Sequence, residues 1–149
     1  MIQRIQTIYL FIAVIIMIAL NWMPIAYLGE LNFFTYGIFS TVAGVSISIS
    51  TYPIAVIVAV STILAAISIF MYKNRVKQAK IVALSIFLDV MFYPIFIAYL
   101  WYSKEALINI DNSFSFALII PAISIILKSL AAKAIKADEK LVRSADRIR

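Results

Sequence analysis

Residues 81–102 read IVALSIFLDVMFYPIFIAYLWY, and the only charged side chain in this stretch is that of Asp89. An α-helix needs about 20 predominantly apolar residues to cross the hydrocarbon core of a bilayer, which is about 30 Å thick. A run of this length with one charge predicts a membrane-spanning helix, and its buried acid is the first candidate for a functional residue.

Three other stretches have the same character, and together with 81–102 they predict four spans. They are residues 5–22, 53–72 and 114–132. Of the 149 residues, 64% are hydrophobic and 13% are charged, whereas soluble domains have about 45–50% and about 25%. The expected fold is a single all-α membrane domain over 1–149, built as a bundle of four transmembrane helices.

The first span can also be read as a cleaved signal peptide. Its charged region, MIQR, is short, and the possible cleavage site at 41–43 lies far downstream. Because a signal peptide normally combines a basic start, a short apolar region and a nearby small-residue site, we expect an uncleaved anchor.

The basic residues indicate the orientation of the spans. Arg4 precedes the first span, four basic residues fill the link 73–80, and seven lie from Lys128 onward. With four crossings these twelve of the thirteen Lys and Arg residues share one side, and only Lys104 lies on the other. Cytoplasmic loops carry the excess of Lys and Arg, so we expect both termini in the cytoplasm.

The outer loop, residues 23–52, has Glu30 as its only charge. Residues 44–52 alternate apolar and serine side chains, and 31–39 are rich in residues that favour strands. Alternation with a period of two predicts a half-buried strand. We expect a small antiparallel β-element between the first two helices; an irregular loop in the interface is the alternative.

Asp89 lies near the midplane of the third span, nine residues beyond Lys80. An ionised carboxylate there costs at least about 2.5 kcal/mol, so it must be paired, hydrated or protonated. Lys128 is the candidate partner, because side chains lean toward the start of their own helix and the two antiparallel helices aim theirs toward each other. Alternatively, Lys128 extends to the cytoplasmic interface and contacts nothing.

The Asp89 carboxylate can also be accommodated without Lys128. Neighbouring helices can satisfy it through hydroxyl groups, and the candidates are Ser85, Tyr93, Ser61 and Ser124. Asp89 can also handle an ion or a proton, as intramembrane acids often do, or contact a partner subunit. The predicted intramembrane polar site is therefore Asp89, Lys128, Tyr93 and Ser85.

Residues 133–149 read KAIKADEKLVRSADRIR and predict a helix that continues the fourth span into the cytoplasm. A thin apolar stripe follows helical spacing and consists of Ala134, Ala137, Leu141, Ala145 and Ile148. Such a tail can lie on anionic headgroups or dock to a cytosolic protein; nucleic acid is not expected, because the tail has no aromatic residue to stack on bases. The predicted contact residues are Lys136, Glu139, Arg143, Asp146 and Arg147.

Catalytic signatures are missing from the sequence. There is no histidine and no cysteine, which removes the commonest zinc and haem ligands and thiolate nucleophiles. No nucleophile–base set, metal cluster or phosphate loop is recognisable. We expect no enzyme, no metal and no other cofactor.

The two ends of the chain, MIQRIQTIYL and KADEKLVRSADRIR, resemble the signature ends of a family of small, uncharacterised membrane proteins of the Bacteroidota. The resemblance implies four spans, a location in the bacterial inner membrane and no assigned activity. It also implies that several polar residues at the ends do more than solubilise, with Gln3 and Gln6 bonding to the start of the tail helix. These residues are Gln3, Arg4, Gln6, Arg143, Asp146 and Arg147.

Few polar residues lie within the spans, which leaves little to line an aqueous path. We therefore expect an accessory or structural subunit of a membrane assembly, in contact with lipid and with a membrane-protein partner or further copies of itself. The alternative is a small proton-coupled carrier that uses Asp89, with Lys128 and Tyr93 beside it. The sequence names no substrate.

Overall fold

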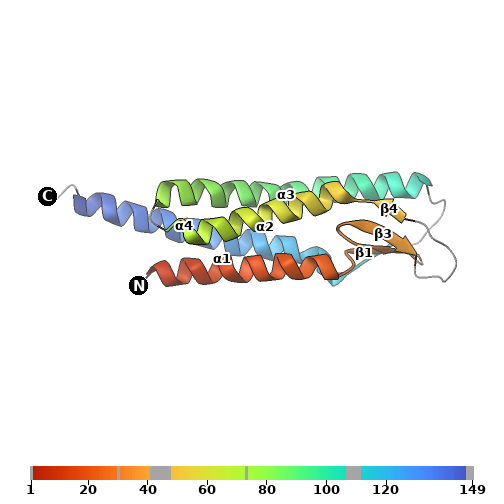
Figure 1. Cartoon of the computed structure of the whole chain (residues 1–149), viewed down its shortest axis with the longest axis horizontal. Coiled ribbons are helices and arrows are strands. Elements are labelled where there is room, and N and C mark those ends of the chain that lie inside the picture. The colour runs from red at the N-terminus through yellow and green to blue at the C-terminus, as the bar shows by residue number, and fades with distance from the viewer. Residues whose placement is uncertain (1, 30, 41–47, 73, 107–111, 147–149) are drawn as a thin grey trace.

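The computed structural model describes residues 2–29, 31–40, 48–72, 74–106 and 112–146. Four long helices run antiparallel to one another along the length of the molecule (Figure 1). Each contains a stretch that is long and apolar enough to cross a membrane. The helices are α1 (Ile2–Ala19), α2 (Tyr52–Phe70), α3 (Arg75–Ala106) and α4 (Ile120–Asp146).

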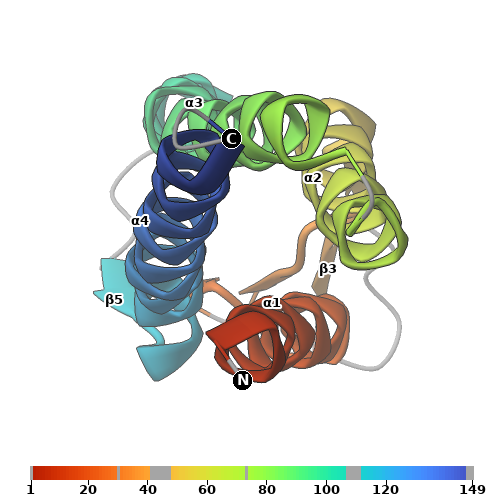
Figure 2. The same ribbon diagram turned by 90° about the vertical axis from the view of Figure 1, so that its left-hand side faces the viewer.

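Viewed end-on, the four helices stand at the corners of a square (Figure 2). Each packs against its neighbour in the sequence, and α1 closes the ring by packing against α4. Both termini lie at one end of the bundle, here called the terminal end, where α2 also turns into α3 (Figure 1). The opposite end carries a small sheet and is called the sheet end.

The sheet has five short antiparallel strands in the order β4-β3-β2-β1-β5. Its register aligns Ala26 with Phe33 and Phe33 with Ile38, and all three side chains are buried. Gly29, at φ 59°, makes the tight turn between β1 and β2. The strands are β1 (Ala26–Leu28), β2 (Leu31–Phe33), β3 (Gly37–Ser40), β4 (Ser48–Ser50) and β5 (Asn112–Phe114).

The predicted β-element between the first two helices is confirmed, but it is larger than expected. The run 31–39 is interrupted by a turn and contributes to two strands, while 41–47 lie outside the described residues. The fifth strand comes from the link between α3 and α4 and pairs with β1. Three-residue strands such as β1 and β5 carry too little periodicity for a sequence pattern to reveal them.

The fourth helix begins later than the sequence predicts. The apolar run starts at Phe114, but this residue ends β5, and a 3₁₀ turn, η2 (Phe116–Ile119), precedes α4. The hydroxyl of Ser115 accepts a hydrogen bond from the Ala117 amide and caps this turn. Pro121 then stands in the first turn of α4, where its missing N–H removes no helical hydrogen bond.

The other predicted bounds also differ from the observed ones. The 5–22 span ends in a 3₁₀ turn, η1 (Leu20–Trp22), and α2 ends two residues before the predicted Tyr72. Helix α3 is longer at both ends than the predicted 81–102. Its 32 residues extend about 48 Å, more than a bilayer core requires, and the sheet packs against the part of α3 that includes Phe92, Phe96 and Leu100.

Two apolar clusters fill the interior of the bundle. The cluster at the sheet end joins the sheet to the helices, and the rings of Phe33 and Phe96 meet edge to face at 5.2 Å. The cluster toward the terminal end is smaller and consists of Leu10, Ala79, Val82, Ala131 and Ile135. Between them, at the middle of the bundle, lies a group of buried polar side chains.

Candidate functional site

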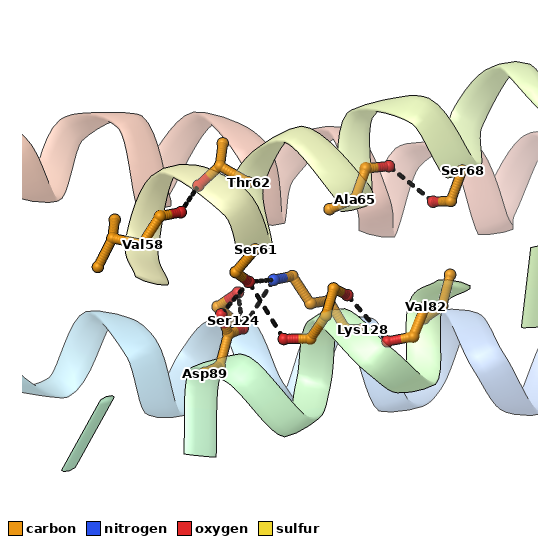
Figure 3. A network of polar contacts seen from close by, with 10 residues as sticks. Val58, Ser61, Thr62, Ala65, Ser68, Val82, Asp89, Ser124 and Lys128 are labelled. Carbon is orange, nitrogen blue, oxygen red and sulfur yellow. Dashed lines mark hydrogen bonds and ion pairs between the residues drawn. The ribbon is translucent and has the colours of Figure 1, made fainter. Parts of the chain in front are cut away.

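The polar group at the middle of the bundle is assembled from three helices. Ser61 comes from α2, Asp89 from α3, and Ser124 and Lys128 from α4. Ser124 and Lys128 are four residues apart, so they lie one above the other on the same face of α4. Figure 3 shows the four side chains converging on one point between the helices.

Asp89 and Lys128 form an ion pair, with 2.7 Å between the lysine Nζ and the carboxylate Oδ2. The Ser124 hydroxyl donates to the same oxygen at 2.9 Å. The Ser61 hydroxyl donates to Asp89 Oδ1 or, at 3.1 Å, to the backbone carbonyl of Ser85. Ser61 also accepts a hydrogen bond from Lys128 Nζ at 2.8 Å, so the network closes on itself.

Both charges are almost fully removed from solvent. Asp89 is 1% exposed and Lys128 is 0% exposed. A buried ion pair is tolerated only when its geometry is good and hydrogen bonds satisfy the remaining atoms, and here three donors from two other helices satisfy the carboxylate. The arrangement is a charge-neutral bridge that ties α2, α3 and α4 together at their middle.

The predicted contact of Asp89 with Lys128 is present, and the alternative in which Lys128 extends to the interface is wrong. The length of α4 explains this outcome, because the helix continues beyond the predicted end at residue 132. Lys128 therefore lies near the middle of the candidate span Phe116–Val142 and not four residues from its end, and its ammonium reaches Asp89.

Two of the four hydroxyl groups considered for Asp89 do contact it, namely those of Ser61 and Ser124. The other two, which were predicted site residues, bond to the backbone. Ser85 donates to the Val82 carbonyl of its own helix at 2.8 Å, and Tyr93 donates to the Leu118 carbonyl at 3.2 Å. Ser85 contributes to the network only through its backbone carbonyl.

A second polar cluster braces the terminal end. The Gln6 amide donates to the Asp138 carboxylate at 2.5 Å, and the Arg75 guanidinium donates to the Asp138 carbonyl at 3.0 Å. The bond expected between Gln6 and the tail helix is therefore present. Sequence reasoning missed Asp138, although it continues the helical spacing of Lys128, Ala131 and Ile135 on the buried face of α4.

The tail is helical as predicted, and α4 runs without a break to Asp146, past the ends of the other helices (Figure 1). Lys136 is exposed and Glu139 is half-buried. In the predicted apolar stripe, Ala134 is partly buried, Ala137 is exposed and Leu141 is 59% exposed. The side chain of Ala145 and all of Ile148 lie outside the residues that the structure describes. The side chains of Gln3, Arg4, Arg143 and Asp146, and all of Arg147, lie outside the described part of the chain.

Further binding features are sparse in the described part of the chain. Its His, Cys, Asp and Glu residues nowhere form a group of three that could hold a metal ion. An open pocket of about 320 Å³ is lined by Ala98, Tyr99 and Tyr102 near the sheet end of α3. It lies at least nine residues along α3 from Asp89, about 14 Å, and is separate from the ion pair.

Comparison with known proteins identifies the family to which the chain belongs. No curated protein is significantly similar to the chain. The family described as a domain of unknown function, DUF4293, matches residues 2–148, nearly the whole length. The chain therefore belongs to the DUF4293 family, whose members share a domain of unknown function.

Proposed function

We propose that the chain is a four-span protein of the bacterial inner membrane that serves as an accessory or structural subunit of a membrane assembly, with its basic tail as the cytosolic contact. The observation that carries the proposal is the braced, projecting α4. This helix forms part of the bundle interior and continues as one element beyond it.

The distribution of apolar residues supports membrane insertion. In each of the four candidate spans only 28% of the residues are buried inside the bundle, and the outward faces carry large apolar side chains such as Phe11, Ile63, Phe87 and Ile126. Monomeric soluble proteins rarely expose apolar patches of this extent to water. A bilayer solvates them directly.

The charges support the orientation. By position in the sequence, eleven basic and three acidic residues belong to the terminal end, while Lys104 and three acidic residues belong to the sheet end. The excess of Lys and Arg favours a cytoplasmic location for the terminal end. Trp22, Tyr52 and Trp101 are exposed near the sheet end, where aromatic side chains favour the opposite interface.

The brace at the base of the tail supports the accessory role. Gln6 from α1 and Arg75 from α3 both bond to Asp138, so the base of the tail is held by two other helices. Beyond it, Lys140, Leu141 and Val142 are exposed. A helix fixed at its base and exposed beyond it is suited to presenting a basic surface with an apolar stripe to a partner.

Co-purification in mild detergent tests this role. We expect the full chain to recover a membrane-assembly partner and a chain ending at Asp138 to lose it, because that truncation removes the projecting tail and keeps both contacts to Asp138. Lys104→Glu, a charge reversal at the sheet end, is the matched control and should retain the partner. Recovery of the full chain alone, as a monomer or homo-oligomer, would contradict the accessory role.

The second candidate is a small proton-coupled carrier, and the observation that favours it is the buried Asp89–Lys128 pair itself. Intramembrane acids commonly mark proton relays. Asp89→Asn removes the charge while keeping the shape, so a carrier loses proton-dependent flux with this variant. A subunit of an assembly keeps its partner. Flux in proteoliposomes and co-purification, measured on the same variant, separate the two roles.

A further inference from the structure

The buried polar side chains of α2 and α3 lie on one side of the ion pair. From Asp89 toward the terminal end, the inner faces of these helices carry five buried polar residues, here called the polar seam: Ser61, Ser68, Gln78, Ser85 and Asp89. The buried apolar side chains of Ala65 and Val82 lie between them on the same two faces. Each of the polar residues is at most 5% exposed. Along α3 the seam extends over eleven residues, or about 16 Å.

The seam lies at the packed interface of α2 and α3, and hydrogen bonds cross it at both of its ends. Ser61 reaches Asp89 and the Ser85 carbonyl near the middle of the bundle. Near the terminal end the Gln78 amide donates to the Ser68 carbonyl at 2.9 Å. Figure 3 shows Ser61 and Ser68 on the same helix, with the ion pair beneath Ser61.

Two buried polar groups on this path lack a full set of partners among the described residues. The Lys128 ammonium has three N–H donors, and two are used, on Asp89 and Ser61. Gln78 donates once to Ser68, while its Oε1 accepts no hydrogen bond from a described residue. Buried polar atoms without protein partners are normally satisfied by ordered water.

The opposite direction is closed by apolar packing. Toward the sheet end, the same two inner faces carry Ile54 and Val58 on α2 and Phe92 and Phe96 on α3, all buried. The rings of Phe92 and Phe96 stack on each other, and Phe33 of the sheet covers Phe96. The side chains of Ile54, Val58, Phe92 and Phe96 carry no polar atom, and the hydroxyl of the adjacent Tyr93 donates to the Leu118 carbonyl.

We infer that the polar seam holds water that connects the Asp89–Lys128 pair with the terminal end of the bundle, while the aromatic layer seals the pair from the sheet end. The ligand of the seam is water, with the hydronium ion that water carries. The pair then exchanges protons with the cytoplasm alone. This inference rests on the orientation proposed above and holds for either proposed role.

The natural chain contains no cysteine, so single introduced cysteines can report water access. Ag⁺ is a probe of suitable size, because it travels in water and displaces the proton of a thiol; its reaction is read as protection from N-ethylmaleimide after denaturation. Ser68→Cys tests the seam and Val58→Cys tests the sealed layer. Asn74→Cys, in the exposed turn between α2 and α3, marks the side on which the terminal end lies.

In inverted membrane vesicles we expect Ag⁺ to react with Ser68→Cys on the order of a hundredfold faster than with Val58→Cys, because an ion is strongly disfavoured in an apolar interior. From the outside of intact cells neither position should react. Ala65→Cys, which lies between Ser61 and Ser68 on the buried face of α2, repeats the test if Ser68→Cys is not inserted.

Two results would overturn the inference. One is an unreactive seam in vesicles where Asn74→Cys reacts, which would mean that the seam is a dry interface in which polar side chains only join α2 to α3. The other is equal reaction at Val58→Cys. If Asn74→Cys reacts only from outside the cell, the proposed orientation is wrong. Water access to the seam is then tested by adding Ag⁺ from outside the cell.

Discussion

The two halves of the bundle interior are held together in different ways. In the half nearest the sheet, the helices meet through large side chains, and Phe92 and Phe96 fill the space beneath the strands. In the terminal half, the apolar residues are fewer and buried polar side chains such as Gln78 and Asp138 cross between helices. Lipid is as apolar as a leucine side chain, so helix association in a bilayer depends on close packing and hydrogen bonds. In the membrane location proposed above, close packing would hold the half near the sheet and hydrogen bonds would hold the terminal half.

The ion pair marks the boundary between the halves, and breaking it should have the largest effect. Lys128→Met leaves the Asp89 carboxylate buried without a counter-charge, and the expected loss is about 3–5 kcal/mol of unfolding free energy. The double variant Asp89→Leu with Lys128→Met removes both charges and should recover most of that loss. Unfolding in detergent measures both, and a double variant as unstable as the single one would contradict the bridge.

The second largest loss of stability is expected in the half near the sheet, where large side chains pack together. Phe96→Ala removes the ring that contacts both Phe92 and Phe33, and a cavity of this kind costs about 3 kcal/mol. Phe87→Ala is the matched control, since Phe87 is on the same helix but is 55% exposed and should change stability by about 0.5 kcal/mol or less. Unfolding in detergent compares the two variants. Equal losses would show that the aromatic layer does not hold the sheet to the bundle.

The polar half should show a smaller effect when a single hydroxyl is removed. Ser61→Ala deletes one donor to Asp89 and one acceptor of Lys128, and the expected loss of unfolding free energy is about 1 kcal/mol. Ser68→Ala is the control, because Ser68 is equally buried on the same helix but its hydroxyl bonds to the Ala65 carbonyl of its own helix. A larger loss at Ser68 would refute the special role of the central network.

The smallest expected effect is at the brace. Gln6→Ala removes the hydrogen bond to Asp138, for which about 0.6 kcal/mol is the typical value between membrane helices. Hydrogen exchange in the last turns of α4 is the more sensitive measurement and should speed up. Ile5→Ala changes a residue on the exposed face of α1 and should leave the exchange in α4 unchanged. If Ile5→Ala speeds up this exchange as much as Gln6→Ala does, the cause is a general change in α1 and not the loss of the hydrogen bond to Asp138.

Much of this architecture can be predicted from the hydrophobic runs. Each run is long enough to form one long helix, and an even number of antiparallel helices brings the two chain ends to the same end of the bundle. The pairing of Asp89 with Lys128 was also predictable, because a buried charge demands a partner and the candidate cation was Lys128. Which of the hydroxyl groups of Ser61, Ser85, Tyr93 and Ser124 contact Asp89 was not predictable. This depends on how each helix is rotated, and these helices are apolar nearly all round, so hydrophobic periodicity does not specify their inner faces.

The sequence by itself determined the number of helices, the location of the charges at one end and the need to neutralise an acid in the middle, because these follow from the cost of apolar surface in water and of charge in hydrocarbon. Only the tertiary structure decided that β5 joins the sheet, that Asp138 faces Gln6, and that polar residues line one half of the interior. These depend on contacts between segments far apart in the chain, which local patterns do not encode.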